Sequence, residues 1–378
     1  MGATSSDGAD GRLHSLDVLR GLDMMVLVGL SPIVKAANSA WGLPEGFMRQ
    51  WSHYWGGFTF YDIIMPLFIF MCGAAVPLAM RRRMTPDGRP GKGFFRHIAV
   101  RFAMLWVFGM AVQGNLLTLD PMKISPFNNT LQAIAVGYVA VALAQLLPRL
   151  WHRVAAAALC VAVYGVLMAA CGDYSKDGNV AQVVEQWILR HVIPDGSSAF
   201  ATHGYTWFLT SLMFAAMTFA GSFATEILGR EGSVARKAGM LAGYGVAMLV
   251  AGWVLSPWVP VIKHVYTVSF SLLAMGWCVL ALAALYALVD GAGFRRWTGL
   301  IELWGRTALT AYMTWNLFRP ALKSAAGVFT VGLERLSCDK VAAFATTVLA
   351  VAFVHFIIVL RNRLKSTRQK APGPNAGA

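Results

Sequence analysis

Charge is scarce in this chain, and acidic charge is scarcer still. Only 13% of the 378 residues are Asp, Glu, Lys or Arg, which is about half the share found in soluble domains, and 57% are hydrophobic. The 18 acidic residues are outnumbered by 32 basic ones, which gives a net charge of +14. So little charge on so apolar a chain excludes an ordinary soluble domain and indicates a polytopic membrane protein.

Two kinds of ligand motif are also missing. The chain has no Gly-rich phosphate loop of the Walker type, and its Cys and His residues show none of the short spacings typical of zinc sites. The basic residues lie mostly in short loops between apolar segments, as topology signals do, and not in a patch that would bind nucleic acid. We therefore expect neither a bound metal nor a nucleic-acid partner.

Ten apolar segments are long enough to cross a bilayer, which takes about 20 residues of helix. Their approximate ranges are 14–36, 58–80, 97–117, 128–147, 152–172, 205–227, 235–255, 265–289, 303–322 and 341–361. The sequence predicts an all-α, polytopic membrane bundle of about ten transmembrane helices, in one domain over residues 13–364. Residues 1–12 and 365–378 are expected to be a disordered cap and a disordered tail.

The distribution of basic residues gives this bundle an orientation. Most Lys and Arg follow the even-numbered segments, whereas the long 173–204 loop is rich in acidic residues and contains a stretch typical of a short helix. By the positive-inside rule, both termini are cytoplasmic and the 173–204 loop lies outside, where its helix would cover the outer mouth of the bundle. The loop after the ninth segment is the exception, because basic residues also occur there.

An unusual polar stretch, "WSHYWGGFTFYDIIMP", runs from Trp51 to Pro66 at the start of the second segment. His53 precedes the segment on the outer side, and Asp62 lies about one turn into it. Ionisable groups in a membrane are costly and usually face a cavity or a partner. Asp62 shares a helical stripe with Pro66, which would free the Asp62 carbonyl and interrupt the helix. His53 and Asp62 are our candidate catalytic pair, and Asp62 either touches the substrate or only orients His53.

Two ion pairs are expected near the cytoplasmic side. Asp17 and Arg20 are three residues apart, and Glu302 and Arg306 are four apart, so each pair shares one helical face. Such pairs have two interpretations. They are either topology-setting charges at the membrane interface or part of a pocket for an anion on the cytoplasmic side.

Other polar candidates lie in or beside the apolar segments. Asn128 and Gln132 are four residues apart and are expected to share a face of the fourth segment. Hydrogen bonding between helices explains them nearly as well as contact with a ligand. Lys263 precedes the eighth segment on the outer side, where either an interfacial role or a substrate contact would suit it. Trp55 suits stacking against a sugar, or the aromatic belt at the membrane interface.

Two stretches, "SLDVLRGLDM" and "HYWGGFTFYDIIMPLFIFMCG", resemble the transmembrane acetyltransferases of the heparan-alpha-glucosaminide N-acetyltransferase family, and most of all their bacterial relatives. In the first stretch the matching positions are Ser15, Leu16, Asp17, Arg20 and Gly21. In the second they are His53, Trp55, Gly57, Asp62, Pro66, Phe68, Phe70 and Gly73. Weaker echoes occur at Leu131 and Gln132, at Lys263, Thr267, Ser269 and Phe270, and at Gly305, Ala308 and Leu309.

The chain departs from the family pattern at several positions. Family members usually have His-x-x-Trp, whereas only Tyr54 separates His53 from Trp55, which puts Ser52 in the aligned slot. Ser31 stands about where the family has an asparagine near the outer end of the first segment.

The resemblance implies a transmembrane acetyltransferase in a bacterial inner membrane. It would move an acetyl group from cytoplasmic acetyl-CoA to an amino sugar of the glucosamine type on the outer side. His53 would act as a base or carry the acetyl group, and Asp62 would fix its tautomer. The implied donor-binding residues are Arg20 and Arg306. The implied acceptor-binding residues are Ser31, Trp55, Asn128, Gln132 and Lys263.

A transporter is the alternative function. Ten spans, a Pro-interrupted helix and polar groups within the membrane also suit a carrier for an amino sugar or N-acetylglucosamine. A purely structural membrane protein is a third interpretation, which the clustering of the few ionisable groups argues against. A homodimer is compatible with the sequence.

Overall fold

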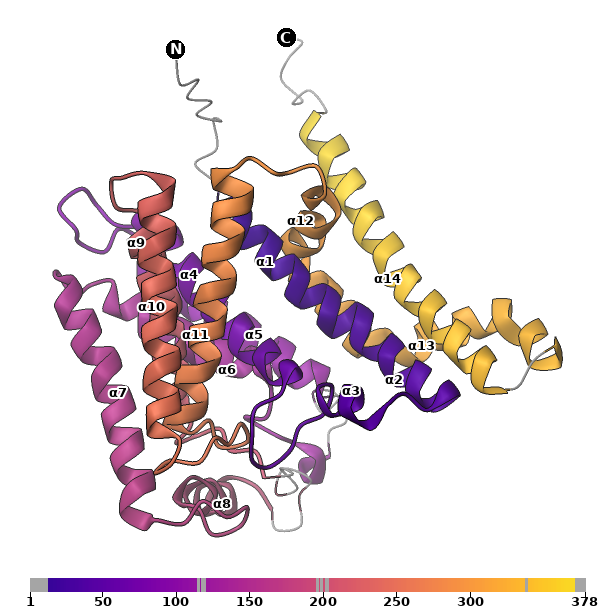
Figure 1. The fold of residues 1–378 in the computed structure, drawn as a ribbon, viewed down its shortest axis with the longest axis horizontal. Helices are drawn as coiled ribbons and strands as arrows, with labels where there is room; N and C mark the ends of the chain where they lie inside the picture. Colours follow the sequence, from indigo (N-terminus) through magenta and orange to yellow (C-terminus); the bar gives the residue numbers. More distant parts are fainter. Residues whose placement is uncertain are drawn as a thin grey trace.

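The computed structural model of the chain is built from helices. It describes residues 13–370 apart from 114–115, 117–119, 195–196, 198–199, 201–203 and 337–338. Within the described residues the helices are joined by loops, and no β-strand occurs (Figure 1). The prediction of an all-α fold is therefore confirmed.

The first half of the chain forms the helices α1 (His14–Met24), η1 (Met25–Leu30, a π-helix), α2 (Ser31–Trp41), α3 (Glu45–Arg49), η2 (Phe60–Ile63, a 3₁₀-helix), α4 (Ile64–Arg81), α5 (Phe94–Val112), η3 (Pro121–Lys123), α6 (Thr130–Ala144), α7 (Leu150–Cys171) and α8 (Val180–Val192). The second half forms α9 (Ser211–Leu228), α10 (Val234–Leu255), α11 (Val268–Leu285), η5 (Tyr286–Gly291), α12 (Thr298–Arg306), α13 (Ala308–Leu336) and α14 (Asp339–Lys370).

Each of the ten predicted segments contains helix, and α8 confirms the short helix in the 173–204 loop. Within the described residues, seven helices are long and apolar enough to cross a membrane. They span 60–81, 94–112, 150–171, 211–228, 234–255, 268–291 and 339–365. These helices mark the chain as a helical membrane protein.

Three of these helices, α5, α7 and α10, lie at the outside of the bundle. They are strongly apolar, yet few of their residues are buried by protein. Leu159 and Val166 of α7 and Trp253 of α10 are among their exposed side chains. A large apolar side chain facing outward is favourable in lipid and costly in water, so these surfaces are the ones that we expect lipid to cover.

Close contacts between small residues hold the centre of the bundle. A Cβ atom added to Gly73 of α4 would overlap the backbone oxygen of Thr218 in α9. One added to Gly221 of α9 would overlap the backbone oxygen of Phe70 in α4. Without side chains at these glycines the two backbones approach closely, as small residues allow in membrane helices. The largest apolar core surrounds this crossing.

A second crossing joins α1 to α12. Gly305 faces the backbone of Asp17, and Gly21 faces the backbone of Ile301, so closely that neither glycine has room for a Cβ. The carboxylate of Asp290 accepts hydrogen bonds from the backbone N–H groups of residues 14 and 15, which satisfies the start of α1. Beside this crossing, α13 and α14 pack on each other and close the fold (Figure 1).

Several boundaries differ from the prediction. Pro66 lies in the first turn of α4 and not in the middle of a longer helix, so it does not interrupt that helix. Asp62 belongs to the 3₁₀ turn before α4. At the other end of the chain, α14 continues to Lys370, past the expected end of the domain at residue 364. The predicted cap at 1–12 and the tail beyond residue 370 lie outside the described residues.

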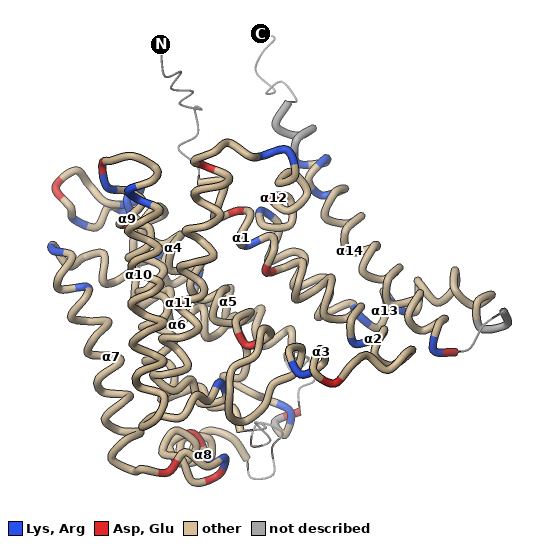
Figure 2. The backbone as a smooth tube through the Cα atoms, viewed as in Figure 1, with Lys and Arg blue, Asp and Glu red and all other residues tan. Residues whose placement is uncertain are grey.

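The start of α1, α12 and the end of α14 lie at one end of the bundle, and α3 and α8 lie at the other (Figure 1). Many Lys and Arg positions of the chain lie at the first of these ends (Figure 2). The opposite end carries Asp and Glu together with scattered Lys and Arg. The site described next lies toward this second end.

Candidate functional site

His53 and Asp62 are joined by a hydrogen bond at the start of η2. His53 Nδ1 lies 2.7 Å from Asp62 Oδ1. The other carboxylate oxygen of Asp62 accepts hydrogen bonds from the backbone N–H of Thr59, at 2.9 Å, and from its hydroxyl, at 2.8 Å. These contacts form a capping box, which fixes both the helix start and the carboxylate. Asp62 is therefore a positioned acceptor that orients His53.

Lys263 also belongs to this group, although it is distant from His53 and Asp62 in the sequence. Its Nζ lies 3.1 Å from His53 Nδ1, 3.2 Å from His53 Nε2 and 3.4 Å from Asp62 Oδ1. With Nδ1–H donated to Asp62, Nε2 of His53 carries the lone pair that a lysine N–H can donate to. The side chains of Asp62 and Lys263 are buried, whereas that of His53 is 30% exposed. The imidazole is the member of the group that a substrate can reach.

The loop between α10 and α11 holds Lys263 in place. The Thr267 hydroxyl donates to the Pro260 carbonyl and accepts the backbone N–H of Ile262. Tyr266 has a φ of 48°, in the left-handed region, and its N–H donates to the Lys263 carbonyl. Ser269 also donates to Pro260. The hydrogen bonds of Thr267 and Ser269 thus fix the turn that carries Lys263.

Burial and neighbouring cations lower the pKa of His53 from its usual range. Desolvation is the largest cause, and the positive charges of Lys263 and Lys35 add to it, whereas Asp62 opposes both. Burial also lowers the pKa of Lys263 to about 8, although Asp62 pulls it upward. At neutral pH the imidazole of His53 is therefore uncharged and can accept a proton.

Tyr61 forms the wall next to His53. The two rings are stacked, with centroids 5.1 Å apart, and the Lys35 ammonium lies 5.4 Å from the centroid of the Tyr61 ring. Ser31 donates its hydroxyl proton to the Tyr61 hydroxyl at 3.0 Å. Ser31, predicted to bind the acceptor, thus reaches the site through Tyr61.

A cavity of about 280 Å³ opens beside the imidazole. Its lining includes His53, Tyr61, Asn128, Thr130, Tyr205 and Lys263. The volume is at the small end of the range for ligand pockets and suits a single sugar ring or a short acyl arm.

Two larger cavities adjoin this one. A cavity of about 490 Å³ shares Leu27, Tyr61 and Thr130 with it. A cavity of about 400 Å³ shares Thr130 with both, and Tyr312 with the second. Thr130 at the start of α6 therefore lies where all three meet.

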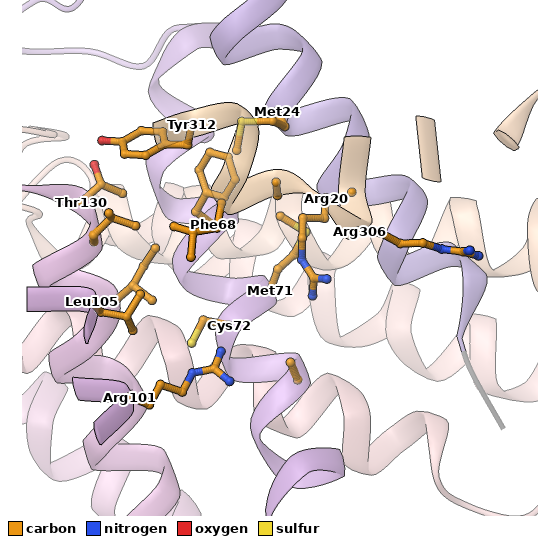
Figure 3. A pocket seen from close by; sticks show the side chains of 16 residues that line it. Arg20, Met24, Phe68, Met71, Cys72, Arg101, Leu105, Thr130, Arg306 and Tyr312 are labelled. Atoms are coloured by element: carbon orange, nitrogen blue, oxygen red, sulfur yellow. The ribbon is translucent and has the colours of Figure 1, made fainter. Parts of the chain in front are cut away.

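The 400 Å³ cavity runs toward the basic end of the bundle. The guanidinium groups of Arg20 and Arg101 enter the same part of it from α1 and α5, and Thr130 and Tyr312 lie together away from them (Figure 3). Arg101 also lies over the Tyr138 ring, 4.7 Å from its centroid. Two cations around one cavity are suited to an anionic ligand.

Arg306 lines this cavity too, but its guanidinium points away from it (Figure 3). It binds Glu302 at 2.8 Å and lies 3.7 Å from Asp17. Arg20 lies 3.4 Å from Asp17. The two predicted pairs, Asp17 with Arg20 and Glu302 with Arg306, are therefore both present, and Asp17 contacts both arginines. Arg306 thus forms ion pairs where α1 crosses α12. Arg101, and not Arg306, directs its guanidinium into the cavity (Figure 3).

Asn128 and Gln132 do not share a helical face. α6 begins at Thr130 with Asn129 as its N-cap, so Asn128 precedes the helix. Gln132 is buried, accepts the N–H of Asn128 at 2.8 Å and donates to the Pro126 carbonyl. Gln132 thus stabilises the turn that brings Asn128 to the His53 cavity. Gln132 itself lines none of the three cavities.

Trp55 lies beside the site and does not line the small cavity. Its ring stacks on His264 with centroids 5.2 Å apart, and its Nε1 donates to the Tyr174 carbonyl. His264 in turn contacts Tyr205, which lines the cavity. Ser52, the residue aligned with the family histidine, donates to the Met48 carbonyl, so His53 is the residue that faces Asp62.

Tyr61, Arg101, Thr130 and Tyr312 were not among the predicted site residues. One signal could have found Tyr61, which sits directly before Asp62 in the polar stretch. Among the described residues, no group of three or more His, Cys, Asp or Glu side chains is placed to hold a metal ion.

Comparison with known proteins adds one family. Residues 12–174 match a family described as a domain of unknown function, DUF5009. The match is less than half of the chain; it includes His53, Asp62 and Asn128 and ends before Lys263. No curated protein matches the sequence.

Proposed function

We propose that the protein is a membrane acetyltransferase that moves an acetyl group from acetyl-CoA to the amine of an amino sugar. The observation that carries the proposal is the His53–Asp62–Lys263 group at the end of a series of cavities whose other end holds Arg20 and Arg101. An oriented, neutral imidazole at one end and a cationic cavity at the other suit a base and an anionic donor.

The donor enters by the cationic end in this proposal. The phosphates of acetyl-CoA bind near Arg20 and Arg101, and the pantetheine arm extends past Thr130 toward His53. The acceptor reaches the 280 Å³ cavity from the opposite end. Because no side chain carries the group across the bilayer, the acetyl group crosses on the donor's own arm.

The chemistry requires one proton to move. The sugar amine attacks the thioester carbonyl, a C–N bond forms, and the C–S bond breaks to release the CoA thiolate. His53 Nε2 accepts the proton that the amine loses and returns it to the thiolate. Lys263, within hydrogen-bond distance of the ring, stabilises the oxyanion of the tetrahedral intermediate. A variant of this route forms an acetyl-histidine first.

The proposed topology has ten crossings, with both termini in the cytoplasm of a bacterial cell and the protein in its inner membrane. Beyond the seven helices that are both long and apolar enough to cross, the α1–η1–α2 rod, α6 and α13 supply the remaining three crossings in this proposal. The basic residues at the end shared by α1, α12 and α14 support a cytoplasmic position for that end (Figure 2).

Acetyl transfer in proteoliposomes tests the proposal. Radiolabelled acetyl-CoA is supplied on one side and glucosamine on the other, and labelled N-acetyl sugar is measured. We expect transfer by wild type and a loss of at least 100-fold in His53→Ala, because a general base contributes roughly 10²–10⁴-fold. His191→Ala is the matched control, since His191 is an exposed histidine on α8. Equal transfer by both variants would refute the role of His53.

A transporter is the second candidate, and the adjoining cavities are the observation that favours it. A solute could move through connected polar spaces without any chemistry. Uptake of labelled glucosamine or N-acetylglucosamine into proteoliposomes without acetyl-CoA would support the transporter. Uptake that requires acetyl-CoA, with recovery of the acetylated sugar alone, would support the enzyme.

A further inference from the structure

The 490 Å³ cavity between α2, α13 and α14 carries an unusual set of cations. Lys35, Arg319 and Lys323 line it, together with the polar side chains of Ser31 and Asn316. Among the described residues, no Asp or Glu lines it. All three cations are exposed, and together they give the hollow a positive potential that favours an anion.

Several basic residues elsewhere in the molecule form ion pairs with acids. Arg81 and Arg153 bind Glu226, Arg295 binds Asp290, and Lys263 binds Asp62. Within the described part of the chain, no ion pair involves Lys35, Arg319 or Lys323, and Lys35 contacts only the face of the Tyr61 ring. Their charge is available to a ligand.

Membrane topology does not account for these three residues. Lys35 and Lys323 belong to the end of the bundle that holds His53, where the positive-inside rule predicts few basic residues. From the sequence, Lys323 was expected in the loop after the ninth segment, the exception to the alternation of basic loops; in the structure it lies within α13. A basic cluster on the outer side therefore needs another explanation, and a bound anion supplies one.

The cavity adjoins the reaction site. It shares Leu27, Tyr61 and Thr130 with the cavity of His53, and Lys35 and His53 both contact the Tyr61 ring. A ligand could therefore occupy both cavities at once. Its anionic group would lie beside Lys35 and its reacting amine beside His53, with the Tyr61 ring next to both.

We propose that this cavity binds an anionic group, a phosphate or a carboxylate, that belongs to the acetyl acceptor. The acceptor is then an amino sugar with an anionic group and not glucosamine itself, an inference that rests on the proposed acetyltransferase function. Arg319 supplies the planar fork that matches such a group, and Lys35 and Lys323 supply point charges. Two sources could supply a phosphate to this cavity, namely a phosphorylated amino sugar and the headgroup of a membrane lipid.

Binding without catalysis is the first test. Purified His53→Ala protein is titrated with glucosamine 6-phosphate, glucosamine and inorganic phosphate, and its thermal unfolding is followed. We expect stabilisation by the phosphorylated sugar at concentrations where glucosamine has no effect. Arg319→Gln and Lys323→Gln should weaken this binding roughly tenfold each. Arg190→Gln, which alters an exposed arginine of α8, should bind as the parent does.

A lipid source is distinguished by reconstitution. Nanodiscs of neutral lipid are compared with nanodiscs that contain phosphatidylglycerol. If phosphatidylglycerol alone stabilises the protein, and Arg319→Gln removes that effect, the anion is a lipid headgroup and the acceptor assignment is wrong. If glucosamine 6-phosphate stabilises the protein equally in both lipids, the anion belongs to the sugar.

Steady-state transfer is the second test, on protein with an intact His53. We expect a KM for the phosphorylated acceptor roughly tenfold below that for glucosamine, and Arg319→Gln should remove the difference, whereas Arg190→Gln should keep it. Equal KM values, together with no stabilisation by phosphate-bearing ligands, would overturn this inference and leave the acetyltransferase intact. Binding of the phosphorylated sugar without any transfer would preserve the anion site and overturn the enzyme.

Discussion

Lys263 and Asp62 form a buried ion pair, with 3.4 Å between the ammonium nitrogen and the nearer carboxylate oxygen, and His53 rests against both. Their side chains are 5% and 2% exposed. Such a pair compensates its own desolvation only when both partners are present. The pair therefore serves two purposes, because it holds the imidazole in one orientation and makes the position of each residue depend on the other.

Removing one partner of this pair should destabilise the protein strongly. We expect Lys263→Met to lower the free energy of unfolding by about 3–5 kcal/mol, because it leaves the Asp62 carboxylate buried without its cation. The double variant Asp62→Asn/Lys263→Met should lose much less than the sum of the two single changes. Thermal unfolding of the four proteins in detergent measures this coupling. Additive losses would show that the pair does not interact.

The pH dependence of transfer should report His53. The imidazole must be neutral to accept a proton, and its folded pKa lies below the usual value of 6.5, so the part of the loss in kcat/KM that is due to His53 should appear only as the pH drops below that value. Protonation of the sugar amine adds a second fall that is the same in every variant. Lys35 is one cause of the low pKa, so Lys35→Gln should raise the pKa and move the loss of activity to higher pH. The assay uses neutral glucosamine, and Lys340→Gln serves as the control. An unchanged profile in Lys35→Gln would contradict this electrostatic coupling.

The fold class and the reactive pair followed from local features of the sequence. Apolar segments of membrane length predicted the helices, and His53 and Asp62 are close enough in sequence that a single turn joins them. Asn128 and Gln132 show the limit of periodicity, because the four-residue spacing holds only inside a helix. The Asn129 side chain accepts the N–H of Leu131 and starts α6 after Asn128.

The rest of the site depends on tertiary contacts. Lys263 was a weak candidate from the sequence, because nothing near it reveals that it meets His53 across 210 positions. Thr130 and Tyr312 are ordinary residues for membrane helices, and only the meeting of three cavities gives them importance. The guanidinium of Arg101 points into the cavity and that of Arg306 points away from it (Figure 3), and the sequence alone does not reveal this difference.

The α1–α12 crossing should be intolerant of added volume. Gly305 faces the backbone of Asp17 without room for a Cβ, so we expect Gly305→Ala to destabilise the protein by about 1–3 kcal/mol. Gly299 lies in the same helix with nothing near its missing side chain. Gly299→Ala should be neutral or stabilising by up to about 1 kcal/mol, because alanine favours helix. Thermal unfolding of both variants measures the contrast, and equal stabilities would argue against close packing at Gly305.

The attachment of α8 should depend on pH through Glu185. One oxygen of its carboxylate accepts the backbone N–H groups of Trp207 and Phe208, and the other is buried with no hydrogen-bond partner among the described residues. Burial is the main cause that raises the pKa of Glu185 to about 7, against 4.5 in the unfolded chain, although the two N–H groups oppose it.

Because the folded pKa is the higher one, the stabilisation is fully present below pH 4.5 and is lost as the pH rises through 7. The shift corresponds to roughly 3 kcal/mol. We expect amide exchange in residues 180–192, corrected for its intrinsic pH dependence, to become faster from pH 5 to pH 8. Glu185→Gln stays neutral and can still accept both N–H groups, so its exchange should not vary with pH in this way. The same pH dependence in the variant would assign it to another group and leave Glu185 as a structural acceptor alone.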